Sequence, residues 1–286
     1  MYKIGYIFDS TAIIQNELIK KYDISFVSLN ISADEKEFKA LEIDEEQFKK
    51  DFDSYSNIKS ASPNPYDFEV AIMEKFKKGY EQVVIVTLSS KISTTYDVAL
   101  LAINDIPSEY RDKVFVHDSL LGSVGMDPLV ASMDAVMAED PDATVIIEEF
   151  EKRRPNSSVL FEINDLKHLF KGGRLSILKY FISVALKIKP LVAFRGGKLS
   201  VIGKNRNRNK TLDILFEQIE ELKTKFKNVF VGLFSYDPED SAYNKLYKTI
   251  TERWPAIKIV ITTRICPVYM THVGIEGYAL SIVAFD

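Results

Sequence analysis

Short apolar runs rich in Val, Ile and aromatic residues alternate along the chain with longer segments of mixed polarity. The short runs are typical of buried strands, and the longer segments between them are typical of helices. The expected strands cover residues 2–8, 24–29, 83–86, 114–116, 159–163, 199–202, 229–234, 257–262 and 278–285. The expected helices cover residues 45–53, 66–78, 94–106, 127–138, 143–153, 166–170, 178–187, 210–225 and 241–254.

This alternation of strands and helices indicates an α/β fold. The chain has 286 residues, and at roughly 150 residues per domain this length suggests about two domains. A charged run that leads into proline and serines, residues 152–158, ends a helix and marks the expected boundary. We therefore predict an N-terminal α/β domain with a largely parallel sheet over residues 1–156. The second α/β domain, with a mixed sheet, is expected over residues 157–286.

Composition excludes several classes of protein. Apolar residues make up 46% and charged residues 27% of the chain, which is typical of globular proteins and excludes intrinsic disorder. The formal net charge of −4 argues against a generic nucleic-acid binder. One cysteine, Cys266, and three histidines exclude a disulfide framework and leave little material for a zinc site, so no metal or cofactor is expected. Asp9 interrupts the first apolar run, and no run approaches the ~20 residues of a membrane span, so the sequence predicts a soluble cytoplasmic protein.

Small polar residues follow three of the expected strands in the first half of the chain. Carboxyl ends of parallel strands are where such sheets bind ligands, and hydroxyls there, beside helix N-termini, suit a carboxylate or phosphate. The alternative interpretation is that each residue caps a helix. Neither G-x-G-x-x-G nor a P-loop occurs, and the Gly172-Gly173 pair follows a helix, so no nucleotide site is expected. The clusters are residues 9–11, 87–90 with 93–95, and 117–119.

A series of motifs resembles, in order and spacing, the DegV family of bacterial fatty-acid-binding proteins. The most specific match is Leu169-Phe170-Lys171-Gly172-Gly173-Arg174-Leu175-Ser176. No single motif identifies the family, but their order along most of the chain does. The other matching segments are Ile7-Phe8-Asp9-Ser10-Thr11, Ser60-Ala61-Ser62-Pro63, Ser89-Ser90-Lys91-Ile92-Ser93-Thr94-Thr95-Tyr96, Asp118-Ser119 with Ser123 and Gly125, Ile188-Lys189-Pro190-Leu191, Gly197-Lys198-Leu199, and His272 with Gly274.

The resemblance implies a carrier protein that is not itself an enzyme. Members of the family have two α/β domains, with a long-chain fatty acid buried between them and in the core. Hydroxyl groups and a histidine hold its carboxylate, and the loaded carrier presents that carboxylate to a separate fatty-acid kinase, which forms an acyl-phosphate from ATP. A carrier of this kind needs no nucleotide site of its own.

The resemblance also assigns roles to particular residues. Ser60, Ser93 and His272 take the positions of the family's carboxylate-binding residues, and Thr94 stands beside Ser93 in the same motif. A carboxylate taken from water must regain its hydrogen bonds, and hydroxyl and imidazole donors supply them. Arg174 matches an arginine implicated near the carboxylate and in kinase contact.

The stretch of residues 195–210 contains Arg206 and is rich in basic residues. It is interpreted either as a solvated hairpin and helix start, or as a dock for an acidic kinase surface or, transiently, for a membrane surface.

Some residues depart from the family pattern, and one alternative function remains. Ala61 lacks a hydroxyl, Ser62 replaces a glutamine, Thr94 replaces a glycine, and Glu276 places an acidic group where glycine is usual. The alternative is a serine hydrolase or esterase in which Ser93, His272 and Asp9 form a triad, although no G-x-S-x-G elbow is present. His117 and His168 are expected to be structural or surface residues.

Overall fold

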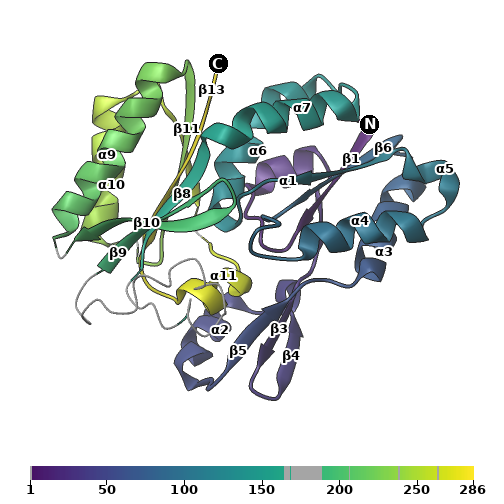
Figure 1. The fold of residues 1–286 in the computed structure, drawn as a ribbon, viewed down its shortest axis with the longest axis horizontal. Helices are drawn as coiled ribbons and strands as arrows, with labels where there is room; N and C mark the ends of the chain where they lie inside the picture. Colours follow the sequence, from purple (N-terminus) through teal and green to yellow (C-terminus); the bar gives the residue numbers. More distant parts are fainter. Residues whose placement is uncertain (1, 164–167, 169–188, 206, 238, 263) are drawn as a thin grey trace.

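The structure of the protein, a computed structural model, describes the whole chain except residues 1, 164–167, 169–188, 206, 238 and 263. Two sheets lie side by side, and a small third sheet lies beneath them (Figure 1). The expected helices over residues 166–170 and 178–187 lie outside the described residues. None of the helices in the described part is both long enough and apolar enough to cross a membrane.

The N-terminal sheet has four strands, all parallel, as predicted. Every residue of its central strand β1 is buried, because helices cover both faces of the sheet. The strand order reverses at β1, whose two neighbours follow it in the sequence on opposite sides. The carboxyl ends of β1 and β6 therefore form the switch point at which sheets of this kind bind ligands. The strands, in sheet order, are β2 (Ser25–Val27), β1 (Ile4–Asp9), β6 (Gln82–Thr87) and β7 (Val114–Asp118).

Two layers of helices cover this sheet. One layer packs on the face that carries Ile7 and Ile85, and the other on the face that carries Tyr6 and Phe8. The first layer consists of α3 (Pro65–Lys77) and α4 (Thr95–Asp105), with the short α5 (Ser108–Arg111) beyond them. The second consists of α6 (Met126–Ala138), α7 (Ala143–Arg153) and the shorter α1 (Asn16–Lys21).

The second sheet has six strands and is mixed, as predicted for the C-terminal part. All neighbouring strands in it are antiparallel except β11 and β12. Helices α9 (Arg208–Lys225) and α10 (Ser241–Arg253) cover one of its faces. The strands, in sheet order, are β10 (Lys198–Asn205), β9 (Lys189–Arg195), β8 (Ser157–Glu162), β13 (Tyr278–Phe285), β11 (Asn228–Ser235) and β12 (Lys258–Thr262).

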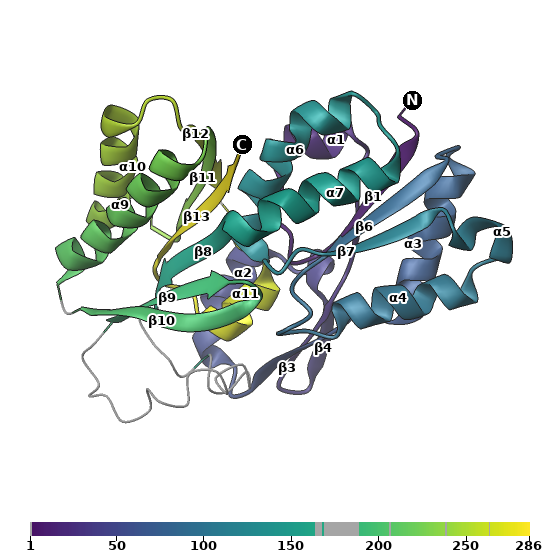
Figure 2. The same ribbon diagram turned by 45° about the horizontal axis from the view of Figure 1, so that its top comes forward.

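Helices α6 and α7 lie between the two sheets (Figure 2). A single apolar core contains Tyr6 of β1, Met133 of α6 and Val283 of β13. The turn between β9 and β10 adds a polar link, because the N–H of Gly197 donates to the Leu120 carbonyl (3.0 Å). The chain enters the second sheet at Ser157. The domain boundary after residue 156 stays a prediction.

The small sheet and the helix that faces it were not predicted. This sheet is antiparallel, and its strand order is β4 (Lys36–Lys39), β3 (Asn30–Ala33), β5 (Ile58–Ala61). Helices α2 (Glu45–Asp51) and α11 (Pro267–Val273) lie next to it. Its strands have four residues each and are only partly buried, so they lack the continuous apolar run of the larger strands. Helix α11 contacts both β3 and β5, which brings residues near position 60 against residues near position 270.

Candidate functional site

A largely apolar cavity lies where the three sheets meet. It has a volume of about 950 Å³, which counts all space between atoms and the part open to solvent. Leu88 follows the switch-point strand β6, Phe161 and Phe194 come from the six-stranded sheet, and Val268 comes from α11. Few polar groups face this space. A concave apolar surface with a few polar groups is typical of a binding site for a small, mainly apolar molecule.

Ser60 and His272 form a polar pair in the cavity lining. Strand β5 supplies Ser60, and the last turn of α11 supplies His272. The Oγ atom of Ser60 lies 2.8 Å from Nε2 of His272, and both residues are half-buried. Helix α11 ends at Val273, and the next residue, Gly274, has a φ of 84°, which glycine adopts without strain. The pair thus joins residues 212 positions apart, as the family motifs anticipated but no local pattern did.

Ser93 belongs to a group of neighbouring hydroxyls at the edge of the cavity. Its Oγ atom lies 2.9 Å from Oγ1 of Thr95 and 3.4 Å from Oγ of Ser62. Ser93 lines the cavity, whereas Thr94 does not; Thr94 is exposed and lies 2.7 Å from Ser62 through its hydroxyl. The ligand-binding role of Thr94 therefore stays a prediction without support from the cavity geometry.

The strand-end residues that we expected to receive an anion are hydrogen-bonded within the protein. Oδ1 of Asp9 accepts from the N–H and the hydroxyl of Thr11 (2.8 and 2.6 Å), and Oδ2 accepts from the N–H of Leu88 (2.6 Å). Oδ1 of Asp118 likewise accepts from the N–H groups of Ser90 and Leu120. The two aspartates bind N–H groups in the turns after β1, β6 and β7, and neither is the N-cap of a helix, so the alternative of helix capping does not describe them.

The same contacts bear on the hydrolase alternative. The carboxylate of Asp9 accepts hydrogen bonds from Thr11 and Leu88, which follow the strand ends. Burial nevertheless raises its pKa. His272 contacts the hydroxyl of Ser60 through Nε2, so the hydroxyl best placed beside this imidazole is that of Ser60. A triad would need the imidazole of His272 to contact both the Ser93 hydroxyl and the Asp9 carboxylate, and the contacts described above differ from these.

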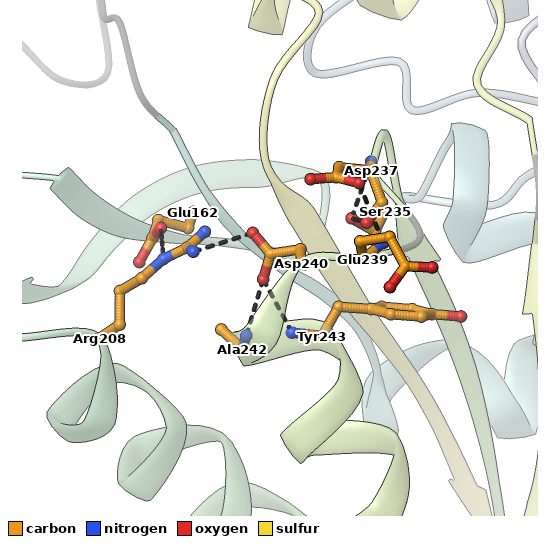
Figure 3. Close-up of polar contacts among 8 residues, drawn as sticks. All are labelled: Glu162, Arg208, Ser235, Asp237, Glu239, Asp240, Ala242 and Tyr243. Atoms are coloured by element: carbon orange, nitrogen blue, oxygen red, sulfur yellow. Dashed lines mark hydrogen bonds and ion pairs between the residues drawn. The ribbon is translucent and has the colours of Figure 1, made fainter.

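An acidic group also lines the cavity, at the end of β8. The side chain of Glu162 is 1% exposed, and its Oε1 accepts a hydrogen bond from Nε of Arg208 (2.9 Å). Arg208 reaches on to Asp240, the N-cap of α10, with Nη1 2.8 Å from Oδ2 (Figure 3). Among the described residues, Oε2 of Glu162 has no hydrogen-bond partner. The sequence carries one signal for this group, an acidic residue inside an expected apolar strand.

Other predicted residues are placed as follows. Glu276 is exposed and belongs to the cavity lining. His117 is buried against Phe150, and burial, with a smaller effect of Arg154, lowers its pKa to about 3, as fits a structural histidine. Arg174 and Arg206 lie outside the described residues, so their roles stay predictions.

Known proteins resemble this chain along nearly its whole length. The family model described as "Uncharacterised protein, DegV family" matches residues 3–284. The fatty acid-binding protein of Thermotoga maritima is 28% identical over 297 residues, which cover 98% of each chain. A structure titled "Fatty Acid Binding of a DegV family Protein from Thermus thermophilus" superimposes with a TM-score of 0.86 at 20% identity and full coverage of both chains. The Fatty Acid Kinase (Fak) B3 protein of Streptococcus pneumoniae, loaded with linoleic acid, superimposes with a TM-score of 0.81 at 22% identity, covering 99% of this chain and 100% of that one.

Proposed function

The chain belongs to the DegV family, and we propose that it is a carrier that binds one long-chain fatty acid. In this proposal it presents the acid's carboxylate to a separate fatty-acid kinase, which forms the acyl-phosphate. Its relatives support the ligand class, because one is a fatty acid-binding protein and another is loaded with linoleic acid. The kinase step is supported by the name of the second relative alone.

The observation that carries the proposal is the pair of Ser60 and His272 in an otherwise apolar cavity. A fatty acid has one polar end and a long apolar chain, and the cavity offers the same division. A bound carboxylate would accept hydrogen bonds from the Ser60 and Ser93 hydroxyls and from the imidazole N–H of His272. These bonds would replace the hydrogen bonds with water that the carboxylate loses when it enters the cavity. The acyl chain would lie against Phe161, Phe194 and their apolar neighbours.

The charge of Glu162 supports this orientation. A second carboxylate brought beside its unpartnered Oε2 would be repelled in a region of low dielectric constant. The fatty-acid head group is therefore better placed at Ser60 and His272 than at the end of β8. The apolar chain has no charge, so Glu162 does not repel it.

The phosphoryl donor would belong to the partner protein. The sequence has neither of the two common nucleotide-binding fingerprints, and Asp9 already occupies the N–H groups at the switch point. In this proposal the chain performs no catalysis of its own. Arg174 and Arg206 remain proposed contacts for the kinase, with a membrane surface as a further, transient contact.

Fatty-acid binding by the delipidated protein tests the proposal. Calorimetry, or displacement of a fluorescent acid, should show about one tight site per chain. Ser60→Ala and His272→Ala should each weaken binding by about 1.5–3 kcal/mol, since a charged group loses a donor. Ser32→Ala on the adjacent strand β3, outside the cavity lining, is the matched control. A folded protein that binds neither saturated nor unsaturated acids, or variants that bind as tightly as the control, would contradict the proposal.

A further inference from the structure

Three residues that line the cavity carry a buried hydroxyl with no hydrogen-bond partner among the described residues. Tyr278 lies beside Arg208, whereas Oη of Tyr269 lies against Gly122, the residue before Ser123. A buried hydroxyl without a partner lowers the stability of the protein. The hydroxyls of Tyr269 and Ser123 together indicate that a bound molecule supplies the missing partners.

The backbone around these hydroxyls is shaped to hold them. A Cβ atom on Gly122 would lie 2.0 Å from Oη of Tyr269, so only glycine leaves room for this hydroxyl. Ser123 follows directly, with a φ of 50°, in the left-handed region that a serine seldom adopts. Leu120 has a similar φ of 52°. Strain of this kind persists where the surroundings impose it, and it is concentrated at binding sites.

A third cavity residue provides an internal comparison. Tyr236 also lines the cavity, and its hydroxyl donates to the carbonyl of Gly274 (2.7 Å). A tyrosine in this lining can therefore be satisfied by the protein, yet Tyr269 is not. Burial, with smaller effects of Cys266 and Asp9, raises the pKa of Tyr269 well above its usual value. Its hydroxyl therefore keeps its proton and can donate.

We infer that Tyr269 and Ser123 form a second polar subsite, which binds an oxygen function carried along the acyl chain of the ligand. Tyr269 precedes His272 by three residues, so the two side chains leave α11 on the same side and one ligand can reach both. A hydroxyl or keto group there would pair with the two buried hydroxyls, whereas a plain methylene would leave both unsatisfied. The ligand class is then an oxygenated long-chain fatty acid. This inference rests on the proposed function.

Paired ligands of equal length test it. The delipidated protein is titrated with stearic acid and with hydroxystearic acids that carry the hydroxyl at different positions. The best positional isomer should bind about tenfold more tightly than stearic acid, which corresponds to about 1.4 kcal/mol or one additional net hydrogen bond. Tyr269→Phe should remove this preference while stearic acid binds as before. Ser123→Ala should reduce it in the same direction.

Tyr236→Phe is the matched control, because it removes a tyrosine hydroxyl from the same cavity that already has a protein partner. It should leave the preference intact. If stearic acid binds and no isomer binds more tightly, the subsite inference is overturned and the carrier proposal stands. An equal loss of both ligands in Tyr269→Phe also overturns it, since the hydroxyl would then serve the carboxylate. Absence of binding by all acids overturns the proposed function and the inference together.

Discussion

Removing the guanidinium of Arg208 should destabilise the protein through Glu162. The Glu162 side chain is 1% exposed, and Arg208 supplies the one hydrogen bond to its carboxylate among the described residues. Arg208→Met keeps a long apolar side chain but leaves a buried carboxylate without a partner. Breaking a buried ion pair from one side costs about 3–5 kcal/mol.

The contacts of Arg208 refine this magnitude. Its side chain is 33% exposed, so water can partly solvate the stranded carboxylate, and we expect a loss of about 2–3 kcal/mol. Asp240 contributes little to the loss, because the N–H groups of Ala242 and Tyr243 still donate to it (2.8 and 3.0 Å). The double variant Glu162→Gln with Arg208→Met should lie within about 1 kcal/mol of the natural protein, since no buried charge remains.

Urea denaturation of the natural protein, Glu162→Gln, Arg208→Met and the double variant forms a double-mutant cycle that isolates the interaction. Arg253→Met is the matched control, because Arg253 pairs with Glu220 where the two side chains are 55% and 45% exposed. The control should lose at most about 1 kcal/mol. If Arg208→Met is as stable as Arg253→Met, then Glu162 is hydrated in solution, and the orientation argument for the ligand fails with it.

Two further predictions concern residues outside the cavity lining. Burial raises the pKa of Asp127 from 3.8 to about 6, against hydrogen bonds from Thr262 and the Gln15 N–H. The contribution of Asp127 to the free energy of unfolding is therefore present below about pH 4 and lost as the pH rises through about 6. Asp127→Asn should make the thermal-unfolding midpoint less dependent on pH over this range. An unchanged pH dependence would refute the raised pKa of Asp127. Gly197 has a φ of 77°, and a Cβ there would lie 2.6 Å from Oγ of Ser89. Gly197→Ala should cost about 2 kcal/mol or more in denaturant unfolding, and Gly196→Ala, with a φ of 56° and open space, should cost less; equal costs would show that the Ser89 contact is unimportant.

The sequence predicted the parts of the fold that depend on long apolar runs. Strands β1 and β6 are buried on both faces, so their composition alone identifies them. Strands β3 and β5 were missed because four half-buried residues leave no such run. Helix α11 was missed as well: most of its seven residues are apolar and most are buried, so they show no alternation of apolar and polar faces that would mark a helical period.

Only those site residues that belong to a family motif could be predicted from the sequence. Family motifs led to Ser60 and His272, and the structure brings these two residues together. They could not show that Thr94 lies outside the cavity lining or that Glu162 and Tyr269 belong to it. Such facts depend on how distant segments pack, and residues 122 and 269 meet only in the folded chain.

The side chain of Asp9 acts as a tethered hydrogen-bond acceptor at the switch point of the parallel sheet. It satisfies the N–H groups of Thr11 and Leu88, the kind of donor that other sheets of this type offer to a phosphate. Because it is attached to the chain, an external anion would have to compete with a very high effective concentration. Binding of an exchangeable molecule is thereby moved from the strand ends to the apolar cavity beside them. Truncation of Asp9 to Ala would reopen this position as an anion hole, which formate or acetate is small enough to refill.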